Sequence, residues 1–291
     1  MVRGYFVSWL SLILILFFTW CFFSCENVAF LWLFIELASL SLIPSFFMYG
    51  GSDGLSGLFS YIVVSSIASS FMVCALVSSG LLVLFYLGLL IKFGVFPFFG
   101  WVYKVVVGSN WFVVWCFSTF LKSPFIFFIF FFLLDVGCGV VEYMCCLTFL
   151  LCTFLFWLYS FNWYYCWCHM MLVSSASLVA MSLVLSVDSL FYLFLVYVIW
   201  ASLVIGYFSL CGDEMVLSSL GFCFLFCFLL VSFPLSLSVF YKLLMGSCIF
   251  SCSFLVFLCW VLYSLSEQFY LVKFVIGNEV PKSLFGVGSV V

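Results

Sequence analysis

The sequence predicts an all-α integral membrane protein, a polytopic helical bundle forming a single membrane domain over residues 1–291. The chain is 69% hydrophobic and only 6% charged, whereas soluble domains carry about 25% charged residues. Its mean hydropathy is +1.48, so polar side chains are too few to cover a water-facing surface. The apolar runs are continuous rather than alternating with polar residues, which favours spanning helices over the strands of a membrane barrel.

A membrane-spanning helix needs about 20 apolar residues. Dividing the sequence at charges and at Gly, Ser and Asn breaks gives ten expected spans, at roughly 5–24, 27–48, 57–79, 81–103, 110–133, 143–161, 167–187, 189–211, 215–245 and 247–272. The first run is too long for the apolar region of a signal peptide, so we expect it to span the membrane. The uncharged stretch 143–187 is too long for one helix and is expected to turn near Asn162.

Four of these spans contain a proline, and the fourth and ninth are expected to be broken helices. Pro97 lies in the fourth span and Pro234 in the ninth. Proline lacks the amide hydrogen that a helix interior requires and clashes with the preceding turn. A lysine lies near each proline, and interrupted helices beside charges indicate an ion pathway in transporter-like folds. We expect the carbonyl groups freed at these breaks to hold water.

An even number of spans places both termini on one side of the membrane. The basic residues then fall on that side, and they are Arg3, Lys104, Lys273 and Lys282. The opposite loops carry only acids, which are Glu26, Asp135, Glu142 and Asp188. By the positive-inside rule, the termini face a cytoplasm or a mitochondrial matrix. Lys104 is interpreted as a boundary residue whose amine reaches the interface.

Four charged residues lie deep within apolar runs: Glu36, Lys92, Lys122 and Lys242. A charge at the bilayer centre costs about 3 kcal/mol or more, so such residues are rare outside ion and proton pathways. Burial disfavours an ammonium group and a nearby carboxylate restores it. A lysine whose acid partner approaches and withdraws therefore stores and releases a proton. The structural alternative is that a buried Lys–Glu pair only sets the helix register.

The 16 cysteines lie mostly in apolar runs, where cysteine behaves as a small hydrophobic residue. Residues 166–169 read Cys-Trp-Cys-His, but no second half of a zinc motif accompanies them. We therefore expect no metal site.

Several motifs, in order, resemble subunit 2 of mitochondrial NADH:ubiquinone oxidoreductase (respiratory complex I), an antiporter-like membrane subunit family. Glu36 and Pro44 match its second-span pattern of Glu followed eight residues later by Pro. Its Lys-x-Gly-x-x-Pro-Phe-x-x-Trp pattern stands at Lys92, Gly94, Pro97, Phe98 and Trp101. Three further similarities lie at Thr119 to Lys122, at Tyr61 with Ala68 and Ser69, and at Ser174 and Ser175 after His169.

The resemblance implies an antiporter-like fold and a subunit of an NADH:ubiquinone reductase that translocates protons. Glu36, Lys92, Lys122 and Lys242 would form its proton relay. This chain would bind no cofactor; NADH, FMN, iron–sulfur clusters and ubiquinone would belong to other subunits. Its expected partners are other membrane-arm subunits, including neighbouring antiporter-like ones, and lipids such as cardiolipin, with no nucleic acid. The expected location is the mitochondrial inner membrane, with both termini in the matrix.

The sequence departs from the family pattern at several positions. Phe99 and Leu178 stand where the family has histidine, and Lys104 where it has glutamate. Lys242 falls one residue later than the family's lysine. Three alternatives remain: another antiporter-like subunit of the complex, a stand-alone cation/proton antiporter, or a structural membrane subunit whose charges only guide helix assembly. Antiporter relatives usually have more spans than the ten expected here.

Overall fold

The computed structural model describes residues 2–49, 52–78, 82–126, 138–212 and 220–279. Every regular element within these ranges is helical, which confirms the all-α prediction. The first half contains α1 (Val2–Ser24), α2 (Val28–Ser41), η1 (Ile43–Tyr49), α3 (Ser52–Val77), α4 (Leu82–Phe93), α5 (Gly100–Val107), α6 (Trp111–Ser118) and η3 (Phe120–Ile126). The second half contains α8 (Cys138–Leu158), α9 (Trp163–Ser182), α10 (Val187–Cys211), α11 (Leu220–Leu229), α12 (Leu237–Phe250) and α13 (Phe254–Glu279).

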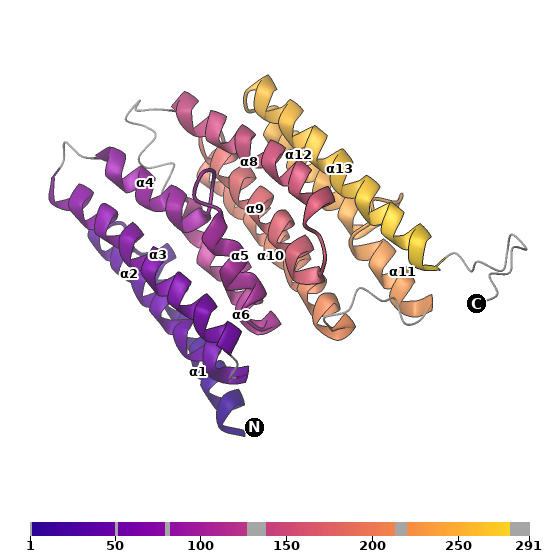
Figure 1. Cartoon of the computed structure of the whole chain (residues 1–291). Coiled ribbons are helices and arrows are strands. Elements are labelled where there is room, and N and C mark those ends of the chain that lie inside the picture. The colour runs from indigo at the N-terminus through magenta and orange to yellow at the C-terminus, as the bar shows by residue number, and fades with distance from the viewer. Residues whose placement is uncertain (1, 50–51, 79–81, 127–137, 213–219, 280–291) are drawn as a thin grey trace, which may run out of the picture.

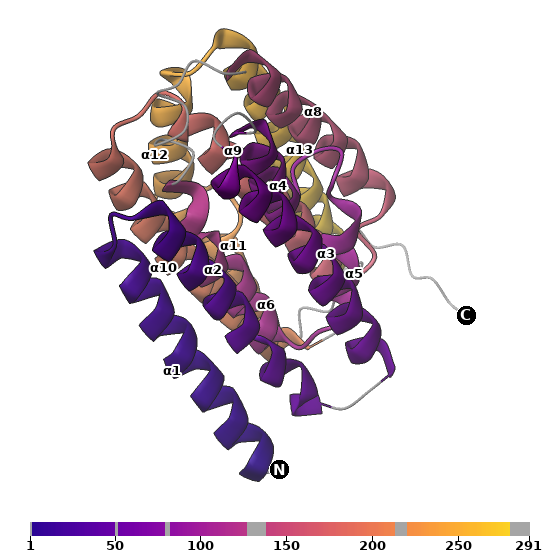
Figure 2. The same cartoon turned by 90° about the vertical axis from the view of Figure 1, so that its left-hand side faces the viewer.

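Among the described residues, seven helical segments are long and apolar enough to cross a membrane. Their outer faces are apolar: Phe6, Trp9, Phe17 and Trp20 of α1 are each more than half exposed. The chain is therefore a multi-pass membrane protein. Figure 1 shows the helices side by side, with the beginning of α1 and the end of α13 at the same end of the bundle. Figure 2 shows α1 at the outer edge of the bundle, beside α2.

The remaining apolar runs are divided in the structure. The run 81–103 forms α4 and α5, and the run 215–245 contributes α11 and the first part of α12. The run 110–133 begins with α6 and η3, and its last residues, 127–133, lie outside the described ranges. Asp135 and Lys282, which belong to the predicted charge asymmetry, also lie outside them. The count of ten spans therefore stays a prediction.

The end of α4 follows directly from its sequence. Gly94 adopts a φ of 67°, a left-handed conformation that commonly ends a helix at glycine. The amides of Gly94 and Val95 donate to the carbonyls of Ile91 and Leu90 at 3.2 Å each. Pro97 then prevents the helix from resuming before α5. Lys92 consequently occupies the last turn of α4, where the helix dipole favours a positive charge.

The second break separates α11 from α12, around Pro234. Leu235 has a φ of 73° there, and the Ser236 hydroxyl caps α12 by accepting from the amide of Val239 at 3.3 Å. Because this cap starts a new helix, α12 runs to Phe250 and α13 covers 254–279. The boundaries expected at 245 and 272 therefore differ from those in the structure.

Helix α9 forms the centre of the bundle. Within its candidate span, 94% of the residues are buried, against 22–44% in the other six. It packs against α8, α5, α10 and α12, and Figure 1 shows it among them. Because other helices surround it, α9 can carry buried His169, Ser174, Ser175 and Ser177 without exposing them to lipid.

Helix α4 approaches α3 closely at Gly88. A Cβ atom added there would lie 2.7 Å from the carbonyl oxygen of Ala68 in α3 and 2.9 Å from Cγ of Met72. Small residues let membrane helices pack this tightly.

We expect Gly88→Ala to lower the free energy of unfolding by about 1–3 kcal/mol, because overpacking forces the backbones of α3 and α4 apart. Gly206→Ala in α10 is the matched control, since nothing lies within 4 Å of its added Cβ and alanine favours a helix by about 1 kcal/mol. Thermal unfolding in detergent compares the two. Equal stability of the variants would contradict the tight contact.

Candidate functional site

All four charged residues singled out in the sequence lie in the interior of the bundle, together with a fifth, Glu267 of α13. The four that form ion pairs have side chains that are at most 17% exposed, and Lys122 is 4% exposed. We call Glu36, Lys92, Lys122, Lys242 and Glu267 the charge array. Lys104, interpreted as a boundary residue, is exposed on α5.

At one end of the charge array, Lys92 of α4 forms an ion pair and hydrogen bond with Glu36 of α2. The α2 backbone is held nearby by two bonds: the Ser39 hydroxyl donates to the Glu36 carbonyl at 2.8 Å, and the Tyr61 hydroxyl donates to the Ser39 carbonyl at 2.9 Å. The pair thus joins the end of α4 to the tethered helix α2, so its two charges come from separate elements.

A first cavity of about 40 Å³ adjoins this pair. Polar and aromatic side chains from several elements line it, including Ser39, Tyr61, Ser65, Lys92 and Trp101, and Leu121 of η3 closes one side. Polar cavities of this size hold water when several hydrogen-bonding groups face them. Because Leu121 precedes Lys122, the wall of the first cavity includes the segment that carries Lys122.

Lys122 is held by neutral oxygen atoms. Its ammonium donates to the Met171 carbonyl at 2.8 Å, to the Ser174 hydroxyl at 2.5 Å and to the Tyr197 hydroxyl at 2.9 Å. These three acceptors match the three donors of an ammonium group. The nitrogen also lies 4.7 Å from the centre of the Tyr197 ring, which attracts a cation. Within the described ranges, Lys122 forms no ion pair.

Local sequence explains why Lys122 lies outside a regular α-helix. The hydroxyls of Ser118 and Thr119 donate back to the carbonyls of Val114 and Trp115 at 2.7 and 2.6 Å, and such bonds bend helices. Pro124 follows within η3. The 3₁₀ segment points Lys122 at α9 and α10, which supply its three acceptors.

At the other end, Lys242 of α12 forms an ion pair with Glu267 of α13, with Nζ and Oε1 2.9 Å apart. The side chains are 14% and 7% exposed. Sequence reasoning missed Glu267, which lies within the last expected span but directly between Ser266 and Gln268, whereas Glu36 lies between two apolar residues. Its partner stands on another helix, and no spacing rule reveals that pairing.

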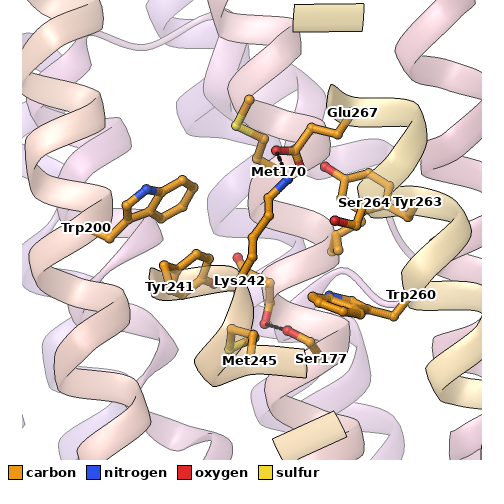
Figure 3. Close-up of a pocket in the computed structure, with 12 residues that line it drawn as sticks. Met170, Ser177, Trp200, Tyr241, Lys242, Met245, Trp260, Tyr263, Ser264 and Glu267 are labelled. Atoms are coloured by element: carbon orange, nitrogen blue, oxygen red, sulfur yellow. Dashed lines mark hydrogen bonds and ion pairs between the residues drawn. The ribbon is translucent and has the colours of Figure 1, made fainter. Parts of the chain in front are cut away.

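A second space, the inner cavity, of about 30 Å³, extends from this pair to Ser174. Ser174, Ser177, Lys242, Ser264 and Glu267 line it. Figure 3 shows the Lys242 amine reaching up from α12 to the Glu267 carboxylate, with Tyr263, Ser264 and Trp260 of α13 around it. Ser174 lines the inner cavity and also accepts from Lys122, so it joins the centre of the charge array to this end.

Side chains from neighbouring segments bind carbonyl groups at both helix breaks. The carbonyl of Ile91 accepts from the Trp101 indole at 3.1 Å. At the second break, the Leu229 carbonyl accepts from the Trp200 indole at 3.1 Å. The Leu230 carbonyl accepts from Ser238 at 3.1 Å and from Gln268 at 3.2 Å. That carbonyls freed at the breaks also hold water stays a prediction.

A further buried polar pair lies beside the charge array. The Tyr103 hydroxyl and His169 Nδ1 are 2.6 Å apart, and His169 is fully buried. Leu178, which stands where the family has histidine, is also buried and apolar. Within the described ranges, no group of three or more His, Cys, Asp or Glu side chains is placed to hold a metal ion.

Breaking the Glu36–Lys92 pair should be more costly than removing it. We expect Glu36→Leu to lower the free energy of unfolding by about 3–5 kcal/mol, because it leaves a buried ammonium unpaired. The double variant Glu36→Leu with Lys92→Met should recover most of this loss. Thermal unfolding in detergent measures both, and a double variant as unstable as the single one would contradict the pairing.

Comparison with known proteins shows similarity in structure but not in sequence. No family model and no curated protein sequence matches the chain. A chain in respiratory complex I from Thermus thermophilus with bound aureothin superposes with a TM-score of 0.75 at 17% identity, covering 96% of this chain and 72% of that one. A chain of the membrane-bound sulfane sulfur reductase, an archaeal respiratory membrane complex, gives 0.75 at 15%, covering 95% and 69%.

A chain of the Mrp complex from Dietzia sp. DQ12-45-1b gives a TM-score of 0.73 at 13% identity, covering 88% of this chain and 57% of that one. At these identities the similarity concerns the fold. This chain therefore has the fold of membrane chains found in respiratory complex I, in the sulfane sulfur reductase and in the Mrp complex.

Proposed function

We propose that this chain is an antiporter-like subunit in the membrane arm of a proton-translocating NADH:ubiquinone oxidoreductase, of the subunit 2 type, and that the charge array carries protons. The observation that supports this most is the continuity of the array. Lys122 lies between two ion pairs, and a cavity adjoins each pair. A chain whose charges only set helix register needs no such cavities beside them.

The Glu36–Lys92 pair is the switch in this proposal. While the Glu36 carboxylate stays near, Lys92 holds its proton. When a change in neighbouring charge draws Glu36 away or neutralises it, the ammonium loses its partner in an apolar setting. Lys92 then gives its proton to water in the first cavity, and a neutral Lys122 amine accepts it. Coupling of this kind needs only an ion pair with two arrangements, biased by charge outside it.

Lys122 is the central carrier. Its three acceptors stabilise the ammonium without adding a charge. The proton on Lys122 is therefore neither held by the charge of a carboxylate nor destabilised by purely apolar surroundings. Ser174 lies between Lys122 and the inner cavity, and a hydroxyl both donates and accepts. The proton therefore continues through Ser174 and cavity water towards Lys242.

Electron transfer takes place elsewhere in this proposal. NADH, FMN, iron–sulfur clusters and ubiquinone belong to other subunits, and this chain responds to their charge changes through neighbouring membrane-arm subunits. The inner mitochondrial membrane is the proposed location, with both termini in the matrix and cardiolipin among the surrounding lipids. The similarity to a chain of the Mrp complex favours one second candidate, a cation/proton antiporter that works without NADH oxidation.

Replacing the central lysine tests the proposal. In membrane vesicles that contain the assembled complex, Lys122→Met should reduce NADH-driven proton transport by about tenfold or more, since a positioned proton-transfer group contributes roughly 10²–10⁴-fold in rate. Lys92→Met should act in the same direction. A pH-sensitive dye in the vesicle lumen measures the transport.

Lys104→Met is the matched control, because Lys104 is exposed and outside the charge array. It should leave transport unchanged. Full transport in Lys122→Met vesicles would refute the relay, while transport that needs Na⁺ or K⁺ but no NADH would favour the antiporter candidate.

A further inference from the structure

Residues 94–99 join α4 to α5, directly after the last turn of α4, which carries Lys92. In a membrane interior, each backbone amide of such a connection needs an acceptor from the protein, because water is scarce there. The first two residues of the connection donate to carbonyls of that last turn, and Pro97 has no amide hydrogen to satisfy. The amide of Phe96, between them, has its acceptor on another helix.

That acceptor is the hydroxyl of Thr148, near the middle of α8. The Phe96 amide donates to Thr148 Oγ1 at 3.0 Å, and the same hydroxyl donates to the Met144 carbonyl of its own helix at 2.8 Å. The second bond fixes the orientation of the threonine side chain, so a lone pair of its oxygen stays directed at Phe96. Thr148 is 1% exposed, so solvent does not compete for this bond.

Helix α8 is itself held against α13, and Figure 2 shows the two helices side by side. The Trp157 indole donates to the Ser266 hydroxyl at 2.7 Å. Just after the end of α8, the Ser160 carbonyl accepts from the Tyr270 hydroxyl at 2.8 Å. Thr148 therefore stands on an anchored helix, and its bond to Phe96 extends that anchorage to the α4–α5 connection.

The connection in turn holds the last turn of α4, to which its first two amides bond. It has little room to shift, because a Cβ at Gly94 would lie 2.5 Å from Val102 Cγ2 on α5 and 3.2 Å from Leu172 Cδ2 on α9. Lys92 lies in that last turn, whereas Glu36 lies on α2, which is tethered independently. The separation of the two charges therefore depends on where α8 holds the connection.

We propose that Thr148 is a positioning residue for the Glu36–Lys92 pair: its hydroxyl holds the α4–α5 connection so that the Lys92 ammonium reaches the Glu36 carboxylate. This inference rests on the proposed proton relay and adds to it a residue that touches neither charge. Removing the hydroxyl leaves the Phe96 amide buried without an acceptor, which is costly. The connection then moves until this amide finds another acceptor, and the last turn of α4 moves with it.

The test is Thr148→Val in membrane vesicles that contain the assembled complex. Valine keeps the shape of threonine but offers no acceptor. NADH-driven proton transport should fall by about tenfold, since a misplacement of about 1 Å at a reacting group can cost about 100-fold in rate. Thr148→Ser keeps the hydroxyl and should restore transport. Thr148→Ala also lacks the hydroxyl and should show the same loss, and it replaces Thr148→Val if that variant does not assemble.

Thr153→Val is the matched control on the same helix. The Thr153 hydroxyl donates to the Phe149 carbonyl of α8 itself at 2.8 Å, so the same substitution removes no bond to the connection. It should leave transport unchanged. Full transport in Thr148→Val, or an equal loss in both valine variants, would overturn the proposal.

Infrared spectroscopy separates positioning from a general structural effect. The carboxylate stretching band of Glu36 is the band that disappears in Glu36→Gln, and its frequency depends on the hydrogen bond from the ammonium beside it. Thr148→Val should shift this band, because Lys92 then stands further from Glu36. Thr148→Ser and Thr153→Val should leave it in place. Reduced transport in Thr148→Val with an unshifted band would assign Thr148 a structural role only.

Comparison with Lys122→Met separates this inference from the relay itself. If Lys122→Met transports protons normally, the relay fails, and the role of Thr148 in it fails too. If Lys122→Met is inactive while Thr148→Val transports normally, the relay stands and Thr148 is not a positioning residue.

Discussion

The structure depends on how ammonium groups are accommodated where water is scarce. An unpaired charge in the bilayer interior costs about 3 kcal/mol or more, so each buried lysine must find compensating oxygen atoms. The chain uses two solutions. Lys92 and Lys242 meet carboxylates, while Lys122 meets a carbonyl and two hydroxyls. A carboxylate alters its charge when it takes up a proton and a carbonyl does not. The partners of Lys92 and Lys242 can therefore change charge, whereas the acceptors of Lys122 stay neutral.

The interruptions in the helices serve this arrangement by fixing where the array begins and ends. Gly94 and Pro97 end α4 just after Lys92, so that lysine occupies the negative end of a helix dipole. Around Pro234, the Leu229 and Leu230 carbonyls bind Trp200, Ser238 and Gln268. Gln268 in turn contacts Glu267. The second break thus anchors the acid that pairs with Lys242, and its carbonyls form part of a rigid frame.

The helical class and the burial of four charged residues were predictable, because both depend on local composition. A lysine or glutamate within an apolar run is visible in the sequence wherever it occurs, and Glu36, Lys92, Lys122 and Lys242 were found this way. Glu267 was missed, since Ser266 and Gln268 flank it directly and its ion pair is made with Lys242 on another helix. The acceptors around Lys122 come from α9 and α10, at Met171, Ser174 and Tyr197, and only tertiary packing brings them together.

Helix boundaries were less predictable than helix positions. Hydropathy does not record where a glycine turns left-handed or a serine caps a new helix, and Gly94 and Ser236 decide two boundaries in this way. Hydropathy is also a weak signal for a helix such as α9, which other helices enclose. Its mean hydropathy of 1.2 is the lowest of the seven candidate spans, because its environment is protein rather than lipid.

That enclosure has a consequence for how the chain is made. The serines of α9 donate to carbonyls of α9 itself, so they carry their partners into hydrocarbon. His169 does not, because its partner Tyr103 stands on α5, and a histidine that loses water before it meets that partner is costly. Since α5 is synthesised before α9 and packs against it, we expect α9 to insert beside helices that are already in the bilayer.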